Sequence, residues 1–320
     1  MFSLNDKKIP VYVISGFLGS GKTTVLLHML EHFKRQNKKP AVILNELGDE
    51  NVEGHLFKDH KMVELLNGCI CCTIQDDLKT TIKELKPEEI DVLLIEGTGV
   101  ANPLEIKDAI LDPIFIDTYE LFSMISIVDA SHYLEYQSFF TSSKDIRELL
   151  KEQVVSASFL IINKIDLVTK GQLQKVEKKV ISELKKEVPI FQTSHGEAPI
   201  DLLLERRIFV DEVTDVKVHK HHHHHHHIEA IKLPVDEHIN RTALESGLRS
   251  LSKHVIRAKG IVRLEGNEEE QFEFQYAANQ LKITPLDLNV GKIQECIILI
   301  GNKIPKDKVE KVFLDQIIKK

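Results

Sequence analysis

The feature that most constrains the fold is a glycine-rich stretch close to the start of the chain. Residues Gly16–Thr23 read GFLGSGKT and fit the pattern G-x-x-x-x-G-K-[ST]. An apolar run, Val11–Ser15, precedes the stretch, and a helical pattern, Thr23–Gln36, follows it. A strand, a glycine loop and a helix in this order form a phosphate-binding loop, because free backbone N–H groups and the helix dipole both attract phosphate.

This P-loop predicts a nucleotide site with specific contacts. Lys22 has the length to reach the β and γ phosphates and to take part in catalysis, and the Thr23 hydroxyl is placed to ligate Mg²⁺. The other residues expected to line the phosphates are Gly16, Gly19, Ser20, Gly21 and Thr24. A glycine-rich turn without a ligand is the alternative, and the flanking strand and helix argue against it.

The first two thirds of the chain alternate apolar runs with helical patterns. Such alternation predicts βαβ units around a mostly parallel sheet, and near-continuous apolar runs suit a sheet covered on both faces. The predicted strands are Val11–Ser15, Ala41–Asn45, Met62–Leu66, Val92–Ile95, Met124–Val128, Phe159–Ile162 and Pro189–Gln192. The predicted helices are Thr23–Gln36, Ile74–Leu85, Lys144–Val154 and Gly171–Lys186.

The pattern changes after Val213, and 320 residues are more than one core usually organises. Residues 215–228 are polar and read as a linker rich in histidine. We therefore expect an α/β P-loop NTPase domain over residues 1–214 and a smaller C-terminal α+β domain over residues 229–320. The elements predicted for the second domain are the strands Ala230–Pro234, Val255–Leu264, Glu270–Tyr276 and Glu295–Ile300 and the helices Arg241–Lys253 and Lys306–Ile318.

A second motif indicates which base the site accepts. Residues Asn163–Asp166 read NKID and follow the apolar run Phe159–Ile162, so they come at a strand's carboxyl end, where open α/β sheets bind ligands. The motif looks like the N-K-x-D guanine motif, in which a carboxylate accepts from two guanine N–H groups that adenine lacks. The residues expected to bind guanine are Asn163, Lys164 and Asp166. Ser194 and His195, after the next strand, are placed to close over the base, with an ordinary polar loop as the alternative.

Two acidic segments follow predicted strands and are candidates for sensing the γ-phosphate. Glu96 follows Val92–Ile95 and precedes Gly99 by three residues, a spacing that suits a position near Mg²⁺ and the γ-phosphate. Glu46 and Asp49 follow an earlier strand and are candidates to orient the attacking water or to touch a metal. Solvated loop carboxylates are the alternative for all three acids.

Three of the four cysteines are clustered, at Cys69, Cys71 and Cys72. Clustered thiols in a reducing compartment indicate a metal, and thiolates favour Zn²⁺ or Cu(I) over Mg²⁺. Three thiols do not close a tetrahedral site, so a fourth ligand is needed from Glu46, a histidine, water or a nucleotide-linked group. Such an open site suits metal exchange. Inert core cysteines or a redox pair are the alternatives, and Cys296, in an apolar run, is expected to be a core residue.

The run His221–His227 lies inside the predicted linker. A flexible cluster of imidazoles can capture a divalent metal weakly and hand it on. A chance linker or an expression tag is the alternative, although a tag normally stands at a terminus.

Composition argues against several classes of partner. The net charge is −7, and no dense block of Lys and Arg offers the basic face that nucleic acid requires. No apolar run approaches the roughly 20 residues that span a bilayer, and the first residues lack the apolar core of a signal peptide. We therefore expect a cytoplasmic protein with no nucleic-acid or membrane partner.

Together these motifs resemble the CobW-type GTPases, the zinc-regulated metalloprotein-activator group of P-loop proteins. The matching segments are Gly16–Thr24 (GFLGSGKTT), Asn45–Asp49 (NELGD), Gly68–Thr73 (GCICCT), Glu96–Pro103 (EGTGVANP), Asn163–Asp166 (NKID) and Arg257–Gly260 (RAKG). The resemblance covers nearly the whole chain, including the histidine linker and the second domain. Gly97 stands where many members carry Ser or Thr, so no hydroxyl contact is carried over to that position.

The resemblance implies GTP hydrolysis, with GDP as product, coupled to metal binding at the C-x-C-C motif and delivery to a client metalloprotein. Zinc is the expected metal, and the same ligands accept cobalt or nickel. A zinc-storage or sensing protein with secondary GTPase activity stays open, as does a cobalt or iron insertase for cobalamin synthesis or nitrile hydratase. A metabolic kinase is disfavoured by the NKID motif. A metal-dependent homo-oligomer is also left open.

Overall fold

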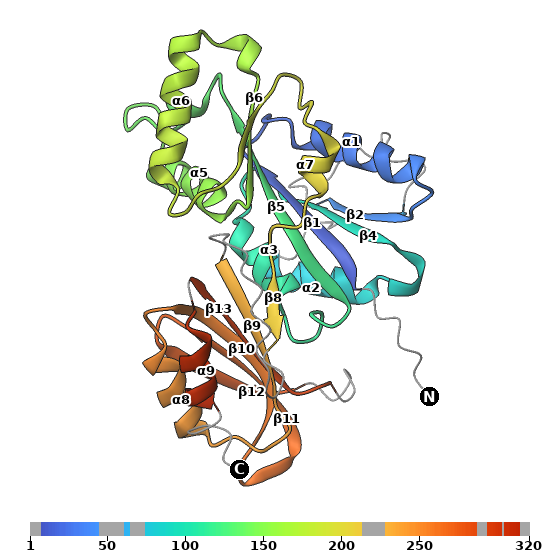
Figure 1. Cartoon of the computed structure of the whole chain (residues 1–320), viewed down its shortest axis with the longest axis vertical. Coiled ribbons are helices and arrows are strands. Elements are labelled where there is room, and N and C mark those ends of the chain that lie inside the picture. The colour runs from blue at the N-terminus through green and yellow to red at the C-terminus, as the bar shows by residue number, and fades with distance from the viewer. Residues whose placement is uncertain are drawn as a thin grey trace. The chain divides into compact units, whose positions relative to one another are not determined.

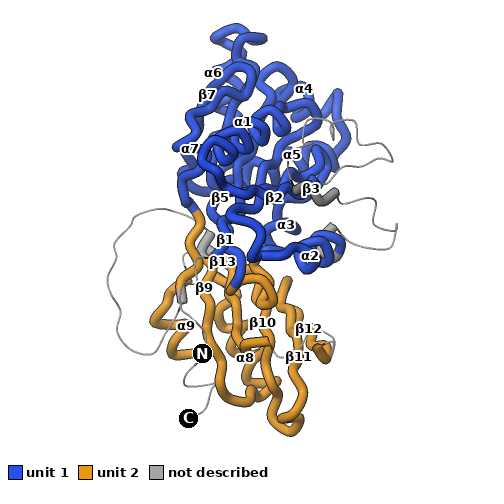
Figure 2. The backbone as a smooth tube through the Cα atoms, turned by 90° about the vertical axis from the view of Figure 1, so that its right-hand side faces the viewer, with its two compact units in different colours: residues 1–110, 118–207 blue, residues 111–117, 208–320 orange. Residues whose placement is uncertain are grey.

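The structure, a computed structural model, describes residues 8–44, 61–64, 74–212, 228–286, 293–302 and 304–313. The chain divides into two compact units (Figure 2). The first consists of Met1–Ile110 and Thr118–Arg207, and the second consists of Leu111–Asp117 and Ile208–Lys320. A short segment from the N-terminal half of the chain therefore belongs to the second unit.

The first unit is built on a parallel sheet (Figure 1). The strand order is β3-β2-β4-β1-β5-β6-β7, and all neighbouring strands in it run parallel. The strands are β1 (Ile9–Gly16), β2 (Pro40–Leu44), β3 (Lys61–Glu64), β4 (Val92–Glu96), β5 (Tyr119–Asp129), β6 (Phe159–Asn163) and β7 (Ile190–Gln192). The P-loop strand β1 thus lies between the strands that end at Glu96 and Asp129.

Helices cover both faces of this sheet. On one face, α1 (Lys22–Arg35) and α7 (Ile200–Leu204) pack against side chains of β1, β2, β4, β5 and β6. On the other face, α5 (Lys144–Ser156) and α6 (Lys170–Glu183) pack against β5 and β6. The shorter elements are α2 (Ile74–Glu84), α3 (Pro103–Ile110), α4 (Tyr133–Tyr136) and the 3₁₀ turns η2 (Pro87–Glu89) and η3 (Ile165–Leu167). The central strands are mostly apolar because both of their faces are buried.

The second unit is an α+β structure. Its sheet has the order β12-β11-β10-β13-β9-β8, and its pairs are antiparallel except for the parallel pair β8–β9. The strands are β8 (Val210–Glu212), β9 (Ile228–Pro234), β10 (Val255–Leu264), β11 (Asn267–Ala277), β12 (Gln280–Pro285) and β13 (Cys296–Asn302). Helices α8 (Arg241–Ser250) and α9 (Lys306–Val312) share a core with this sheet. The predicted fold class, a parallel P-loop sheet with a smaller α+β unit, is confirmed.

The segment Leu111–Asp117 is an integral part of the second unit. Leu111 and Ile116 share a core with Cys296 and Ile298 of β13, so Cys296 is a core residue as predicted. Two ion pairs accompany this apolar contact. Asp112, fully buried, lies 3.8 Å from the Nζ of buried Lys259 on β10, and Asp117 pairs with buried Lys232 on β9.

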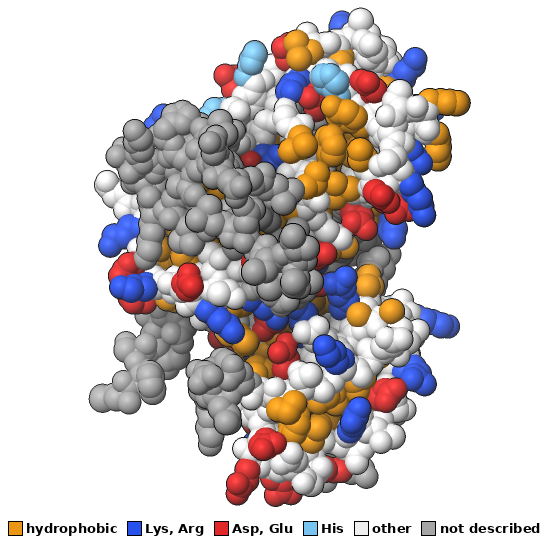
Figure 3. Space-filling view, turned by 180° about the vertical axis from the view of Figure 1, so that it is seen from behind, with side chains coloured by type: hydrophobic (Ala, Val, Ile, Leu, Met, Phe, Trp, Pro, Cys, Tyr) orange, Lys and Arg blue, Asp and Glu red, His pale blue; other side chains and the backbone are white. Residues whose placement is uncertain are grey.

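The surface mixes both signs of charge. On the face drawn in Figure 3, described Lys and Arg side chains are interspersed with Asp and Glu and do not merge into one basic field. None of the described helices is both long enough and apolar enough to cross a membrane.

The buried pair predicts an asymmetry between two Asp substitutions in the second unit. Asp112→Asn removes a carboxylate charge beside the buried Lys259 ammonium, and we expect a loss of about 3 kcal/mol in the free energy of unfolding of this unit. Asp211→Asn is the matched control, because its partner Lys306 and Asp211 itself are each about half exposed, at 52% and 44%. Breaking that pair should cost less than about 1 kcal/mol. Urea denaturation measures both, and equal losses would contradict this account.

Candidate functional site

Parallel pairing brings the predicted motifs to one edge of the first sheet. In the register of the strands, Ile14 of β1 is paired with Glu96, and Gly16 with Ile127 of β5. Asp129, at the end of β5, is paired with Asn163 at the end of β6. Because the carboxyl ends of parallel strands meet at the same edge, segments that are far apart in sequence become neighbours.

The P-loop leaves the start of α1 without a side-chain cap. Gly21, the N-cap residue of α1, has a φ of 104° and makes no side-chain capping hydrogen bond. By contrast, α5 and α6 are capped by Ser143 and Thr169. The first N–H groups of α1 are therefore not used by a cap, which is the arrangement that binds phosphate. A Cβ at Gly21 would lie 2.5 Å from Nδ2 of Asn163, so only glycine fits there.

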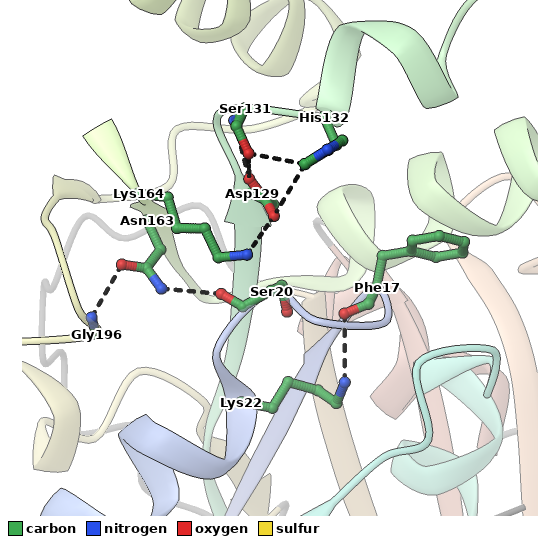
Figure 4. A network of polar contacts seen from close by, with 9 residues as sticks. All are labelled: Phe17, Ser20, Lys22, Asp129, Ser131, His132, Asn163, Lys164 and Gly196. Carbon is green, nitrogen blue, oxygen red and sulfur yellow. Dashed lines mark hydrogen bonds and ion pairs between the residues drawn. The ribbon is translucent and has the colours of Figure 1, made fainter. Parts of the chain in front are cut away.

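The P-loop lysine and threonine contact other parts of the edge. Lys22 is buried, and its Nζ donates to the backbone oxygen of Phe17 over 3.3 Å (Figure 4). The Thr23 hydroxyl donates to Oε1 of Glu96 over 3.1 Å. The hydroxyl and carboxylate are hard oxygen donors of the kind Mg²⁺ prefers, so this pair fits the cation expected beside the phosphates.

Two buried hydroxyls at this edge fit a polar ligand. Ser20 in the P-loop is fully buried, and Thr98, in the loop after Glu96, is 9% exposed. Among the described residues, neither hydroxyl has a hydrogen-bond partner. A buried hydroxyl normally makes at least one hydrogen bond, so these two are suited to phosphate oxygens or their waters.

Asn163 connects the P-loop to the loop after β7. Its side-chain amide is 2% exposed. Nδ2 donates to the backbone oxygen of Ser20 over 2.9 Å, and Oδ1 accepts from the backbone nitrogen of Gly196, also over 2.9 Å (Figure 4). The loop is further held because Thr193 N donates to the Ile162 oxygen over 2.9 Å. One side chain thereby links the P-loop to the loop after β7.

Lys164, the second residue of the NKID motif, is held by a partner that the sequence did not reveal. Its Nζ lies 2.6 Å from Oδ2 of Asp129 (Figure 4). Asp129 also accepts from the backbone nitrogen and the hydroxyl of Ser131, and His132 lies 3.5 Å away. Burial alone would raise the pKa of Asp129, but the hydrogen bonds from Lys164 and Ser131 and the lysine charge together hold that pKa below its usual value. The carboxylate is therefore ionised and fixes the direction of the lysine.

The other residues predicted to contact the base are partly or fully exposed, in η3 and in the loop after β7. Asp166 is exposed in η3, just after Lys164, which has a left-handed φ of 61°. In the loop after β7, Ser194 is half-buried and His195 is exposed.

Of the predicted phosphate residues, Gly16 is buried at the end of β1, whereas Gly19 and Thr24 are exposed.

The predicted metal and switch residues are not part of the described structure. Glu46, Asp49, Cys69, Cys71 and Cys72 lie outside the described residues, as does the run His221–His227. Within the ranges that the structure does describe, no group of three or more His, Cys, Asp or Glu is arranged to hold a metal ion. The metal-site predictions therefore stay predictions.

The fold and this edge define the chain as a P-loop nucleotide-binding protein. A family model of the CobW/HypB/UreG nucleotide-binding domain matches residues 10–192, and a model of the cobalamin synthesis protein cobW C-terminal domain matches residues 228–316. The chain belongs to the CobW/HypB/UreG family of P-loop GTPases. The family resemblance of the motifs is thereby confirmed.

Relatives with curated names extend over most of the chain. A zinc chaperone CobW from Pseudomonas aeruginosa is 31% identical over 294 residues, which cover 81% of this chain and 78% of that protein. The zinc chaperone YjiA from Escherichia coli is 28% identical over 324 residues, which cover 95% and 98%. A crystal structure of Zn(II)-bound YjiA GTPase from E. coli covers 97% of this chain and 99% of its own, at 23% identity and a TM-score of 0.49.

The Asn163 clamp predicts a loss of nucleotide affinity when it is removed. Asn163→Ala deletes both hydrogen bonds and leaves two backbone groups without partners, so we expect the Kd for GDP to rise about 10- to 100-fold. Isothermal titration measures this Kd. Asn240→Ala, which removes the cap of α8 in the second unit, is the control and should leave the Kd unchanged. Unchanged GDP affinity in Asn163→Ala would contradict the clamp.

The lowered pKa of Asp129 predicts a pH dependence. The pKa of Asp129 lies below that of an unfolded aspartate. The contacts of its carboxylate with Lys164 and Ser131 therefore stabilise the first unit fully above about pH 4, and this stabilisation is lost as the pH falls further. Asp129→Asn should lower the free energy of unfolding at pH 7. It should also make this free energy fall less steeply as the pH is lowered. Urea denaturation between about pH 7 and pH 3 tests this, and parallel curves for the two proteins would refute it.

Proposed function

We propose that this chain is a GTP-hydrolysing metallochaperone that binds a transition metal, zinc, through Cys69, Cys71 and Cys72 and delivers it to a client metalloprotein. The Asn163 amide carries the nucleotide part of this proposal, because it joins the P-loop to the base loop at one sheet edge. The metal part is supported by the cysteine cluster and by relatives that carry the name zinc chaperone.

The nucleotide would bind along the carboxyl edge of the sheet. The residues proposed for the phosphates are Gly16, Gly19, Ser20, Gly21, Lys22, Thr23, Thr24 and Gly99. Asp166 accepts from guanine, and Lys164, directed by Asp129, lies along the base. Ser194 and His195 close over its open side.

Thr23 and Glu96 are the residues proposed to hold Mg²⁺, which when bound neutralises charge on the phosphates. Lys22 exchanges its bond to the Phe17 oxygen for contact with the β and γ phosphates. Glu46 or Asp49 orients the water that attacks the γ-phosphate in line. The protein contributes position and electrostatic stabilisation, and no covalent intermediate is required.

Coupling between nucleotide and metal follows from the order of the strands. β2 ends at Leu44 and β3 at Glu64, and these two residues are paired at the same sheet edge as Glu96. The chain leaves that edge into the segments that contain Glu46 and the cysteine motif. We propose that GTP orders the Glu46 segment, which completes the thiolate site, and that hydrolysis removes these contacts and releases the metal.

The second unit would bind the client or a partner subunit, and the histidine run would collect metal for transfer. A reducing cytoplasm suits this role, because it keeps the thiols available as ligands. The same ligands also accept cobalt and nickel, so a competition titration decides the metal.

Thermodynamic linkage provides the test. If GTP tightens metal binding, metal must tighten GTP binding by the same factor. We expect zinc affinity, measured by competition with a chromophoric chelator, to be at least about 10-fold tighter with a non-hydrolysable GTP analogue than with GDP. The double variant Cys71→Ala, Cys72→Ala should abolish this difference and keep nucleotide binding.

Three outcomes separate the alternatives. Stoichiometric loss of zinc on hydrolysis supports delivery, whereas zinc held through turnover indicates storage or sensing. Equal zinc affinity with both nucleotides defeats the coupling. Preferential binding of cobalt over zinc in the competition favours an insertase for that metal.

A further inference from the structure

The loop between β4 and α3 contains a tight turn directly after Glu96. The backbone nitrogen of Ala101 donates to the Thr98 oxygen over 3.0 Å, so Thr98–Ala101 forms a β-turn with Gly99 and Val100 at its centre. Neither central residue has a positive φ, which excludes type II and the primed turn types. Two residues before the turn, Glu96 accepts from the Thr23 hydroxyl.

A buried amide on α5 holds the centre of this turn. Gln153 is 2% exposed, and its Nε2 donates to the backbone oxygen of Gly99 over 3.1 Å. A glutamine in a helix face that packs on a sheet is costly to bury unless its amide is hydrogen-bonded. The neighbouring positions on the same helix face, Leu150 and Val154, are apolar core residues. Packing alone does not explain a glutamine between them.

The turn also lies against the P-loop. A Cβ at Gly99 would be 2.6 Å from the backbone nitrogen of Leu18, so the turn and the P-loop are in direct backbone contact. Gln153 also lines a cavity of about 10 Å³ together with Leu18 and Asp129. The turn therefore contacts both the P-loop and the Gln153 amide.

Fixing the Gly99 oxygen also fixes the orientation of the next N–H group. In a trans peptide the two point in opposite directions, so the Val100 N–H is directed away from Gln153. Rotating this peptide to a type II turn would require a positive φ at Val100, which a β-branched residue resists. The hydrogen bond from Gln153 thus keeps the turn in one of its two orientations.

We propose that Gln153 is a positioning residue that sets the preference for GTP over GDP. It holds the turn Thr98–Ala101 against the P-loop, where the buried Thr98 hydroxyl and the backbone of Gly99 meet the γ-phosphate. The inference rests on the proposed GTP site and does not depend on the proposed metal site. GDP lacks the γ-phosphate and gains nothing from an ordered turn, so the effect of Gln153 is confined to the triphosphate.

Gln153→Met tests this, because methionine has nearly the same length and suits a buried position but cannot donate a hydrogen bond. We expect the Kd for a non-hydrolysable GTP analogue to rise about 5- to 30-fold, with the Kd for GDP changed by less than about twofold. The turnover number for GTP should fall as well. Gln172→Met, which affects only the exposed cap of α6, is the control and should leave the ratio of the two Kd values unchanged.

Gln153→Glu supplies a readout that a purely structural role would not move. An ionised glutamate repels the Gly99 oxygen, whereas a protonated one donates to it, so the preference for the GTP analogue should recover as the pH is lowered. If both substitutions weaken GTP and GDP equally, Gln153 only supports the fold and the inference is wrong. If the unaltered protein binds neither nucleotide, the proposed function itself fails, which is a different result.

Discussion

The side-chain amide of Asn163 is the contact on which the candidate nucleotide site depends. Its Nδ2 donates to the backbone oxygen of Ser20 in the P-loop, and its Oδ1 accepts from the backbone nitrogen of Gly196 in the loop after β7. Both groups are backbone atoms of loops, which lack the ladder hydrogen bonds that hold strands in place. A buried amide with both of its ends paired is rigid, since moving either loop would leave a polar group without a partner.

Two further anchors extend this constraint along the sheet edge. Asp129 directs Lys164 on the side of the base, and Gln153 holds Gly99 on the side of Glu96. All of them project from strands or helices of the scaffold onto loops that carry the candidate contacts. These side chains restrict the conformations of the loops, because they are held by strands and helices with regular backbone hydrogen bonding.

Much of this site could be predicted because its motifs are local in sequence. The P-loop and the NKID segment each combine a short pattern with an adjacent apolar strand, and parallel pairing brings them together. Asp129 and Gln153 could not be found in this way, because their partners lie 35 and 54 residues away. The sequence did offer one indication that Asp129 belongs to the site: it ends an apolar strand, as Asn163 does.

The fold was predictable where apolar runs were continuous, as in β1, β4 and β6. The prediction omitted α3, whose eight residues are too short for a clear helical period, and β12, a partly exposed strand with a mixed pattern. Nothing in the sequence indicated that Leu111–Asp117 belongs to the second unit, since this depends on long-range pairs such as Asp112 with Lys259.

That segment has a practical consequence for anyone who wishes to isolate the C-terminal half. A fragment starting at Ile228 would contain β9 to β13 and both helices, yet it would lack β8 and the strip of chain that shares a core with Cys296 and Ile298. It would also separate the buried Lys232 and Lys259 from Asp117 and Asp112. Cleaving the chain within the predicted histidine linker therefore does not yield two complete units. A fragment that contains the whole second unit has to begin at Ile208, before β8, and the missing heptapeptide has to be supplied or grafted on.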